Sequence, residues 1–94
     1  MGLKVWFWTK QLNSQYWQNR LEAVCVLKQL GDACAVVPLI KVLEDNSDHV
    51  RCAAASALGT LCDALAVEPL IKVLADVDEE VRRAAAAALG QLGE

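Results

Sequence analysis

A 31-residue self-similarity restricts the folds open to this chain more than any other feature. Residues 19–49 and 50–80 align without a gap and agree at 15 of 31 positions, and residues 81–94 begin a third copy. Both full copies contain the segment AVxPLIKVLxD. A period of this length is typical of stacked helical hairpins, in which each repeat buries its apolar face against its neighbours. The sequence therefore predicts an all-α solenoid.

The apolar spacing within each repeat predicts two helices. The first helix of the central repeat carries apolar residues at i, i+3, i+4, i+7, i+8 and i+11, which share one helical face: Val50, Ala53, Ala54, Ala57, Leu58 and Leu61. Ser47 and Asp78 precede helices of this kind and are expected as N-caps. A shorter second helix follows, with Pro38 or Pro69 near its start, because proline cannot donate a backbone hydrogen bond.

The same register extends back towards the N-terminus. Shifted by 31 positions, residues 4–13 fall on the second helix of the next repeat, so they are expected to be the second helix of a preceding half-repeat. Full repeats follow at 19–49 and 50–80, and a leading half-repeat occupies 81–94. We expect a single domain over residues 1–94, a short α-α superhelix of about five helices in antiparallel hairpins.

Composition narrows the possible partners. A net charge of −3 gives no electrostatic reason to bind a phosphate backbone, so no nucleic acid partner is expected. No segment approaches the roughly 18–20 apolar residues that span a bilayer, so we expect no membrane partner and a cytoplasmic location. The four cysteines lack the paired spacing of a zinc site and share one histidine. We therefore expect no metal and no cofactor, with cysteine serving as a small residue at helix contacts.

Two motifs carry a family resemblance. The sequence VRxAAAxALGxL, followed by AVxPLIKVLxDxD, closely resembles the HEAT-like repeats of phycobilisome lyase subunits, and it is similar to consensus alpha-solenoid repeats of the same length. The resemblance covers nearly the whole chain. It implies a right-handed superhelix with first helices on the convex side and second helices lining the concave side. Such repeats serve many unrelated roles, so the resemblance specifies the fold far better than the function.

An acidic turn residue precedes an arginine by six positions in successive repeats. The resemblance to HEAT repeats implies that these residues form a structural ladder, in which charge-assisted hydrogen bonds tie each turn to the adjoining helix. A second interpretation is an anion site made of the arginines alone. The ladder residues are Arg20, Asp45, Arg51, Asp76 and Arg82, and Ser14 stands six positions before the first arginine.

The outward positions of the second helices are the candidates for partner binding, because solenoids use the concave row to recognise extended partners. One lysine recurs there at 31-residue intervals and forms a basic stripe that suits an acidic peptide. A solvated lysine row without a partner is the other interpretation. The candidate residues of the row are Trp6, Lys10, Val37, Lys41, Glu44, Glu68, Lys72 and Ala75.

Every tryptophan, tyrosine and phenylalanine lies within the first 17 positions, as Trp6, Phe7, Trp8, Tyr16 and Trp17. Such a cluster acts either as a cover over the end of the stack or as a contact for a partner or a flat ligand. The register makes Trp8 a core position, which favours the cover. Trp6 and Trp17 fit the cover least well, so they are expected to contact another molecule.

The ends of the array raise a separate question, because a terminal repeat normally needs a polar outer face. The helix at 81–92 carries an uncovered stripe of alanine and leucine. Two explanations are open: the chain is a fragment of a longer array, or two chains form a homodimer through the open solenoid ends.

These observations favour a non-catalytic interaction or scaffold module that binds a protein or peptide through the concave helix row or the open ends. The sequence offers no Ser-His-Asp set, Cys-His set or phosphate loop, so no catalytic residue is nominated and no enzyme is expected. The resemblance implies one alternative, a phycobilin lyase-like subunit that handles a bilin chromophore. A self-assembling structural spacer is another.

Overall fold

The computed structural model describes residues 2–93, and this part of the chain consists of helices joined by short turns. The expected all-α class is confirmed, but six α-helices are present in residues 2–93 rather than about five, because each half-repeat adds one helix to the four of the full repeats. None of the described helices has the length and apolarity needed to cross a membrane. In chain order, the elements are α1 (Leu3–Gln11), α2 (Trp17–Leu30), η1 (Ala33–Ala35), α3 (Val36–Val42), α4 (Asp48–Leu61), η2 (Ala64–Ala66), α5 (Val67–Val73) and α6 (Glu79–Gln91).

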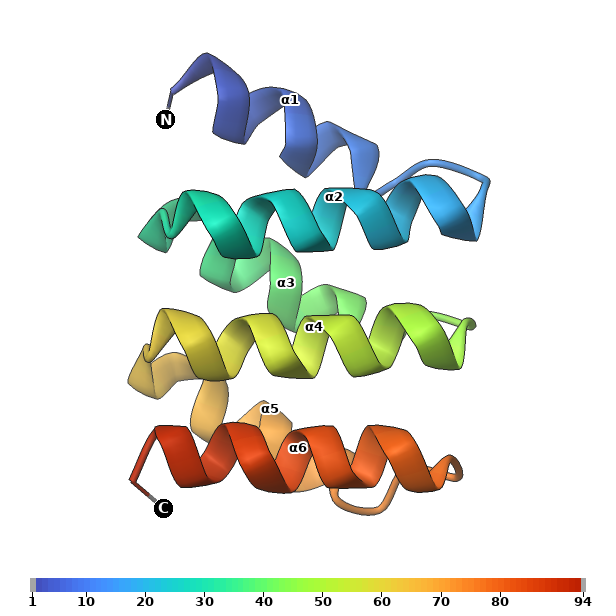
Figure 1. Ribbon diagram of the computed structural model, residues 1–94, viewed down its shortest axis with the longest axis vertical. Helices are drawn as coiled ribbons and strands as arrows, with labels where there is room; N and C mark the ends of the chain where they lie inside the picture. Colours follow the sequence, from blue (N-terminus) through green and yellow to red (C-terminus); the bar gives the residue numbers. More distant parts are fainter. Residues whose placement is uncertain (1, 94) are drawn as a thin grey trace.

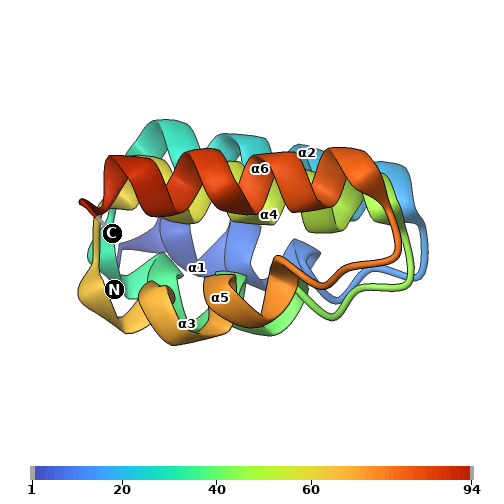
Figure 2. The ribbon, with the colours of Figure 1, turned by 90° about the horizontal axis from the view of Figure 1, so that it is seen from below.

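The helices form two layers. The long helices α2, α4 and α6 lie side by side in one layer, and α1, α3 and α5 form the other (Figures 1 and 2). We call these the long-helix layer and the short-helix layer. Each member of the short-helix layer packs chiefly against the long helix that follows it, so the contacts join α1 to α2, α3 to α4 and α5 to α6. These helical pairs are offset by half a period from the sequence repeats, because each full repeat contains a long helix followed by a short one.

The core follows the apolar face expected for the first helix of the repeat. Val50, Ala54, Ala57 and Leu58 of α4 are fully buried. Burial of such side chains supplies the main driving force for stacking. Glu22, at the start of the equivalent face in α2, is exposed instead.

Side-chain caps fix where the helices start. The Ser47 hydroxyl accepts a hydrogen bond from Val50 N, and the Asp78 carboxylate accepts one from Val81 N, as expected for N-caps. Asp32 caps the 3-10 turn η1 rather than α3 itself, through a bond from Cys34 N. Short 3-10 turns of this kind lead directly into α3 and α5.

The residue that ends each of two long helices has a left-handed backbone. Gly31 has φ 64° and Cys62 has φ 53°, and Gly93 takes φ 83° just beyond α6. Glycine adopts this conformation freely, whereas the left-handed conformation costs a residue with a Cβ roughly 1–2 kcal/mol of conformational free energy. Cys62 therefore stands at a glycine position rather than at a tight helix contact. Cys25 and Cys34 are exposed as well, so among the cysteines the expected packing between helices is found only for the partly buried Cys52.

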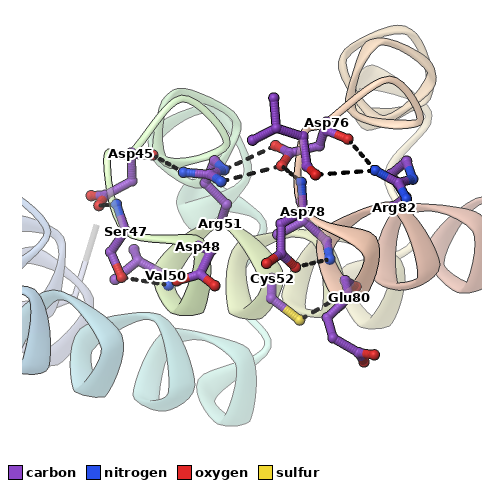
Figure 3. A network of polar contacts seen from close by, with 12 residues as sticks. Asp45, Ser47, Asp48, Val50, Arg51, Cys52, Asp76, Asp78, Glu80 and Arg82 are labelled. Atoms are coloured by element: carbon purple, nitrogen blue, oxygen red, sulfur yellow. Dashed lines mark hydrogen bonds and ion pairs between the residues drawn. The ribbon is translucent and has the colours of Figure 1, made fainter.

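Two arginines near the start of long helices bind an aspartate in the turn of the next helical pair, where the pairs are α1–α2, α3–α4 and α5–α6. Arg20 Nε donates to Asp45 Oδ2 at 2.7 Å, and Arg51 Nε donates to Asp76 Oδ2 at 2.9 Å. In each pair Nη2 donates to the other carboxylate oxygen, at 3.0 and 3.2 Å respectively, so both contacts are bidentate. The paired residues are 25 positions apart in the sequence, and the bonds join one helical pair to the next (Figure 3).

The six-residue spacing seen in the sequence has a different role. At that spacing the arginine Nη1 donates to a backbone carbonyl oxygen, not to the carboxylate (Figure 3). Each guanidinium therefore fastens the turn before its own helix. The bond recurs as Arg20 to Ser14 at 2.8 Å, Arg51 to Asp45 at 2.8 Å and Arg82 to Asp76 at 2.7 Å.

The ladder carboxyls are partly buried and stay ionised. The side chains of Arg51 and Asp76 are only 13% and 12% exposed. Desolvation by itself raises the pKa of Asp76, but hydrogen bonds from Arg51 and from the Asp78 backbone outweigh it, so the net pKa lies below the ordinary value. The same balance lowers the pKa of Asp45. Both carboxylates therefore keep their charge at neutral pH.

Two glycines one repeat apart provide a matched test of helix packing. A Cβ at Gly59 would lie 2.8 Å from Ala88 Cα and would also meet Gln91 Oε1, so α4 and α6 would have to separate. At Gly90 no described neighbour lies within 4 Å of such a Cβ. We expect Gly59→Ala to destabilise the fold by about 1–3 kcal/mol. Gly90→Ala should instead stabilise it by up to about 1 kcal/mol, because alanine favours helix.

Urea unfolding monitored by circular dichroism measures both changes in the free energy of unfolding. If the two substitutions had the same effect, the close contact between α4 and α6 would be wrong.

Candidate functional site

Two grooves open on the short-helix layer. The first, of about 370 Å³, lies between α1 and α3, and the second, of about 380 Å³, lies between α3 and α5. The grooves are built from repeat-equivalent positions, so the 31-residue register produces both. Six lining positions match between the two grooves. In the first groove they are Thr9, Leu12, Asn13, Pro38, Lys41 and Asp45. In the second they are Ile40, Leu43, Glu44, Pro69, Lys72 and Asp76.

Each groove combines an apolar wall with one lysine. Lys41 lines the first groove and Lys72 the second, and both lysines are exposed. Neither forms an ion pair with any residue in the described part of the chain. Asp45 and Asp76 also line the grooves, but their carboxylates are already held by ladder arginines. Both lysine charges are therefore unpaired within the described part of the chain.

Most of the expected row is brought together here. Val37 and Glu44 line the first groove beside Lys41, and Glu44 lines the second groove as well. Ala75 joins the second groove, whereas the exposed Glu68 does not line it. Glu44 is thus shared between the two grooves, and it is the anionic group at the ridge that separates them.

Trp6 and Lys10 lie outside both grooves. The Lys10 ammonium sits 5.4 Å from the centre of a Trp6 ring on α1, and both side chains are exposed. This geometry suits a cation–π contact, which at an exposed site contributes about 0.5–1 kcal/mol. The two residues lie at one edge of the short-helix layer.

Trp17 is separate from the row. It starts α2 in the long-helix layer and stacks on His49 at the start of α4, with ring centres 5.2 Å apart and 25° between planes. The side chain keeps 38% of its surface exposed. One face of Trp17 is therefore used within the chain, which sequence reasoning did not anticipate because stacking across repeats has no local signature.

The remaining aromatic residues do not form one pocket. Trp8 is partly buried against the core and meets Phe7 edge to face, with ring centres 5.2 Å apart. Phe7 and Tyr16 stay about half exposed. Neither groove is lined by an aromatic side chain.

Thr9 is a groove residue that the sequence prediction missed. Its hydroxyl oxygen is buried and has no hydrogen-bond partner among the described residues. An unpaired buried hydroxyl costs free energy, so the position is unusual. The sequence contains one indication of this position. The 31-residue register aligns Thr9 with Ile40 and Ile71, so a polar residue stands where the other repeats have isoleucine.

Comparison with known proteins supports the repeat assignment. A family model described as HEAT repeats matches residues 6–90. No curated protein sequence matches. Among solved structures, the chain is similar to one in the complex of CpcE and CpcF of phycocyanin lyase from Nostoc sp. PCC7120, with a TM-score of 0.90 and 33% sequence identity.

That match covers 100% of this chain but only 39% of the other, so the likeness extends to a part of the lyase subunit. It confirms the resemblance to phycobilisome-lyase-type repeats. Since the family model covers most of the sequence and the helices stack as the repeat requires, the chain belongs to the HEAT-repeat family.

Proposed function

We propose that this chain is a non-catalytic binding module that holds an acidic segment of a partner protein on its short-helix layer. The observation that carries the proposal is the pair of repeat-equivalent grooves, each with an unpaired lysine. Apolar walls next to a single positive charge suit a peptide that presents acidic and apolar side chains in alternation.

An extended segment suits the two grooves better than a compact ligand. The grooves open side by side on one layer because α3 forms a wall of both. A chain that crosses α3 places one side chain in each groove and passes the exposed Glu44 at the ridge. Glu44 disfavours a second acidic side chain at that point, so it contributes to the choice of partner.

A double charge reversal tests the proposal. We expect Lys41→Glu with Lys72→Glu to weaken binding of a peptide made of three Glu-Leu-Asp-Ala units by at least tenfold, because two attractive contacts become repulsive. The amide shifts of the ¹⁵N-labelled protein on titration measure both affinity and location. The largest shifts should fall in α3 and α5.

The matched control reverses two charges on the other layer, with Lys28→Glu and Arg83→Glu. This variant should bind the peptide as the unchanged chain does. Equal binding by both variants, or shifts confined to the long-helix layer, would mean that the grooves are not the binding site.

The similarity to a chain of the phycocyanin lyase complex supports a second candidate, a subunit or segment of a lyase that handles a bilin. The exposed faces of Trp6 and Phe7 on α1 offer flat apolar surface for a tetrapyrrole. In this role the chain binds the chromophore, and the grooves contact the acceptor protein.

Mixing with free biliverdin tests this candidate. Binding against the aromatic side chains should shift the visible absorbance band and quench tryptophan fluorescence, and Trp6→Ala should reduce both effects. An unchanged absorbance spectrum at a protein excess would rule out the bilin role.

A further inference from the structure

The two grooves have similar volumes and one lysine each, but only the first is lined by uncharged polar side chains. These are Thr9 and Asn13, and the register places Ile40 and Glu44 at the same positions of the second groove. Glu44 itself lines both grooves, so its charge does not distinguish them. The residues lining the first groove therefore provide neutral side-chain donors, and those lining the second do not.

Thr9 has a hydroxyl that is not used inside the described part of the chain. Its oxygen is buried and has no hydrogen-bond partner among residues 2–93, although the side chain lines the first groove. A threonine on a helix has two favoured rotamers, and rotation between them redirects the hydroxyl. Because this hydroxyl gives up no hydrogen bond when it turns, an acceptor placed in the groove supplies a partner that the free chain does not.

Two further donors line the same groove. The exposed Asn13 carboxamide can donate two hydrogen bonds, and the Lys41 ammonium, which forms no ion pair within residues 2–93, can donate three. The Asp45 carboxylate is engaged elsewhere, since Arg20 donates to both of its oxygens. The first groove thus presents three side-chain donors to its occupant.

We infer that the first groove binds a carboxylate side chain of the partner segment through Lys41, Asn13 and Thr9, whereas the second groove binds an apolar side chain. A carboxylate accepts hydrogen bonds at two oxygens, so it can satisfy an ammonium group and neutral donors together. In the second groove Ile40 offers apolar contact at the position of Thr9, and a carboxylate buried there would keep fewer donors for its oxygens.

The inference rests on the proposed function and adds an order to it. The acidic side chain lies between α1 and α3, and the apolar side chain lies between α3 and α5. The long helices pack against one another in the same repeat, at a usual separation of about 8–10 Å, which an extended chain covers in about three residues. A partner with one acidic and one apolar side chain at this separation is therefore bound in one direction only.

Thr9→Val tests the carboxylate site, because valine keeps the size of threonine and removes the donor. We expect the peptide of three Glu-Leu-Asp-Ala units to bind about tenfold more weakly, the effect of one hydrogen bond to a charged group. Thr9→Ser keeps the hydroxyl and should bind within about twofold of the unchanged chain. The amide shifts of the ¹⁵N-labelled protein measure the affinities. Urea unfolding should show Thr9→Val to be at least as stable as the unchanged chain, because valine removes a buried unpaired hydroxyl.

Ile40→Thr tests the apolar site, with a second peptide of three Glu-Ser-Asp-Ala units as the matched probe. This substitution should weaken binding of the leucine peptide about fivefold and leave binding of the serine peptide unchanged, because the serine peptide has no leucine contact to lose. Thr9→Val should weaken binding of both peptides to the same extent, since both keep their carboxylates.

Two results would overturn the inference alone. One is binding that Lys41→Glu with Lys72→Glu abolishes but that Thr9→Val leaves unchanged, which would make the unpaired hydroxyl a structural feature only. The other is an effect of Thr9→Val that disappears with the serine peptide, which would place the apolar side chain in the first groove. Failure of the unchanged chain to bind either peptide would instead remove the proposed function, and this inference with it.

Discussion

The bidentate bond between an arginine and the aspartate of the next helical pair fixes how the helical pairs stack. One guanidinium reaches in two directions: Nη1 holds the carbonyl oxygen of the preceding turn, and Nε and Nη2 hold the next carboxylate. That carboxylate also accepts the backbone N–H two residues later. The bond to the preceding carbonyl oxygen recurs in three turns and the bidentate bond recurs in two, so each long helix starts at an equivalent position relative to its neighbour. Apolar packing provides the stability of the stack, and the ladder sets its register.

The sequence predicted the helical faces and caps well, because burial and capping leave local periodic signals. Val50, Leu58 and Ser47 each have the expected role. Contacts that depend on distant residues could not be read in the same way. The phase of the helical pairs is one example, since a periodic sequence does not define where a structural unit begins. The close approach of α4 to α6 at Gly59 is another, because it depends on Ala88 and Gln91, which are distant in the sequence.

The candidate site was predictable to the extent that it follows the register. Lys41, Lys72 and Glu44 share the grooves because their positions repeat along the short helices. The stacking of Trp17 on His49 across two long helices could not be predicted from the sequence, and the expected contact of Trp17 with another molecule stays a prediction. The carboxylate partner of Arg20 or Arg51 could not be predicted from a local pattern either. The charged groups are 25 residues apart in the sequence, and only the folded stack brings them together.

The central claim is that the Arg51–Asp76 bond couples the helical pair α3–α4 to the helical pair α5–α6, and a double-mutant cycle tests it most directly. Arg51→Ala, Asp76→Ala and their combination are compared by urea unfolding, with the exposed pair Arg83 and Glu79 as the control. A coupling energy of about 1–3 kcal/mol is predicted for the ladder pair. The control pair should show less than about 0.5 kcal/mol, because exposed ion pairs contribute little. Additive effects of Arg51→Ala and Asp76→Ala would contradict the claim.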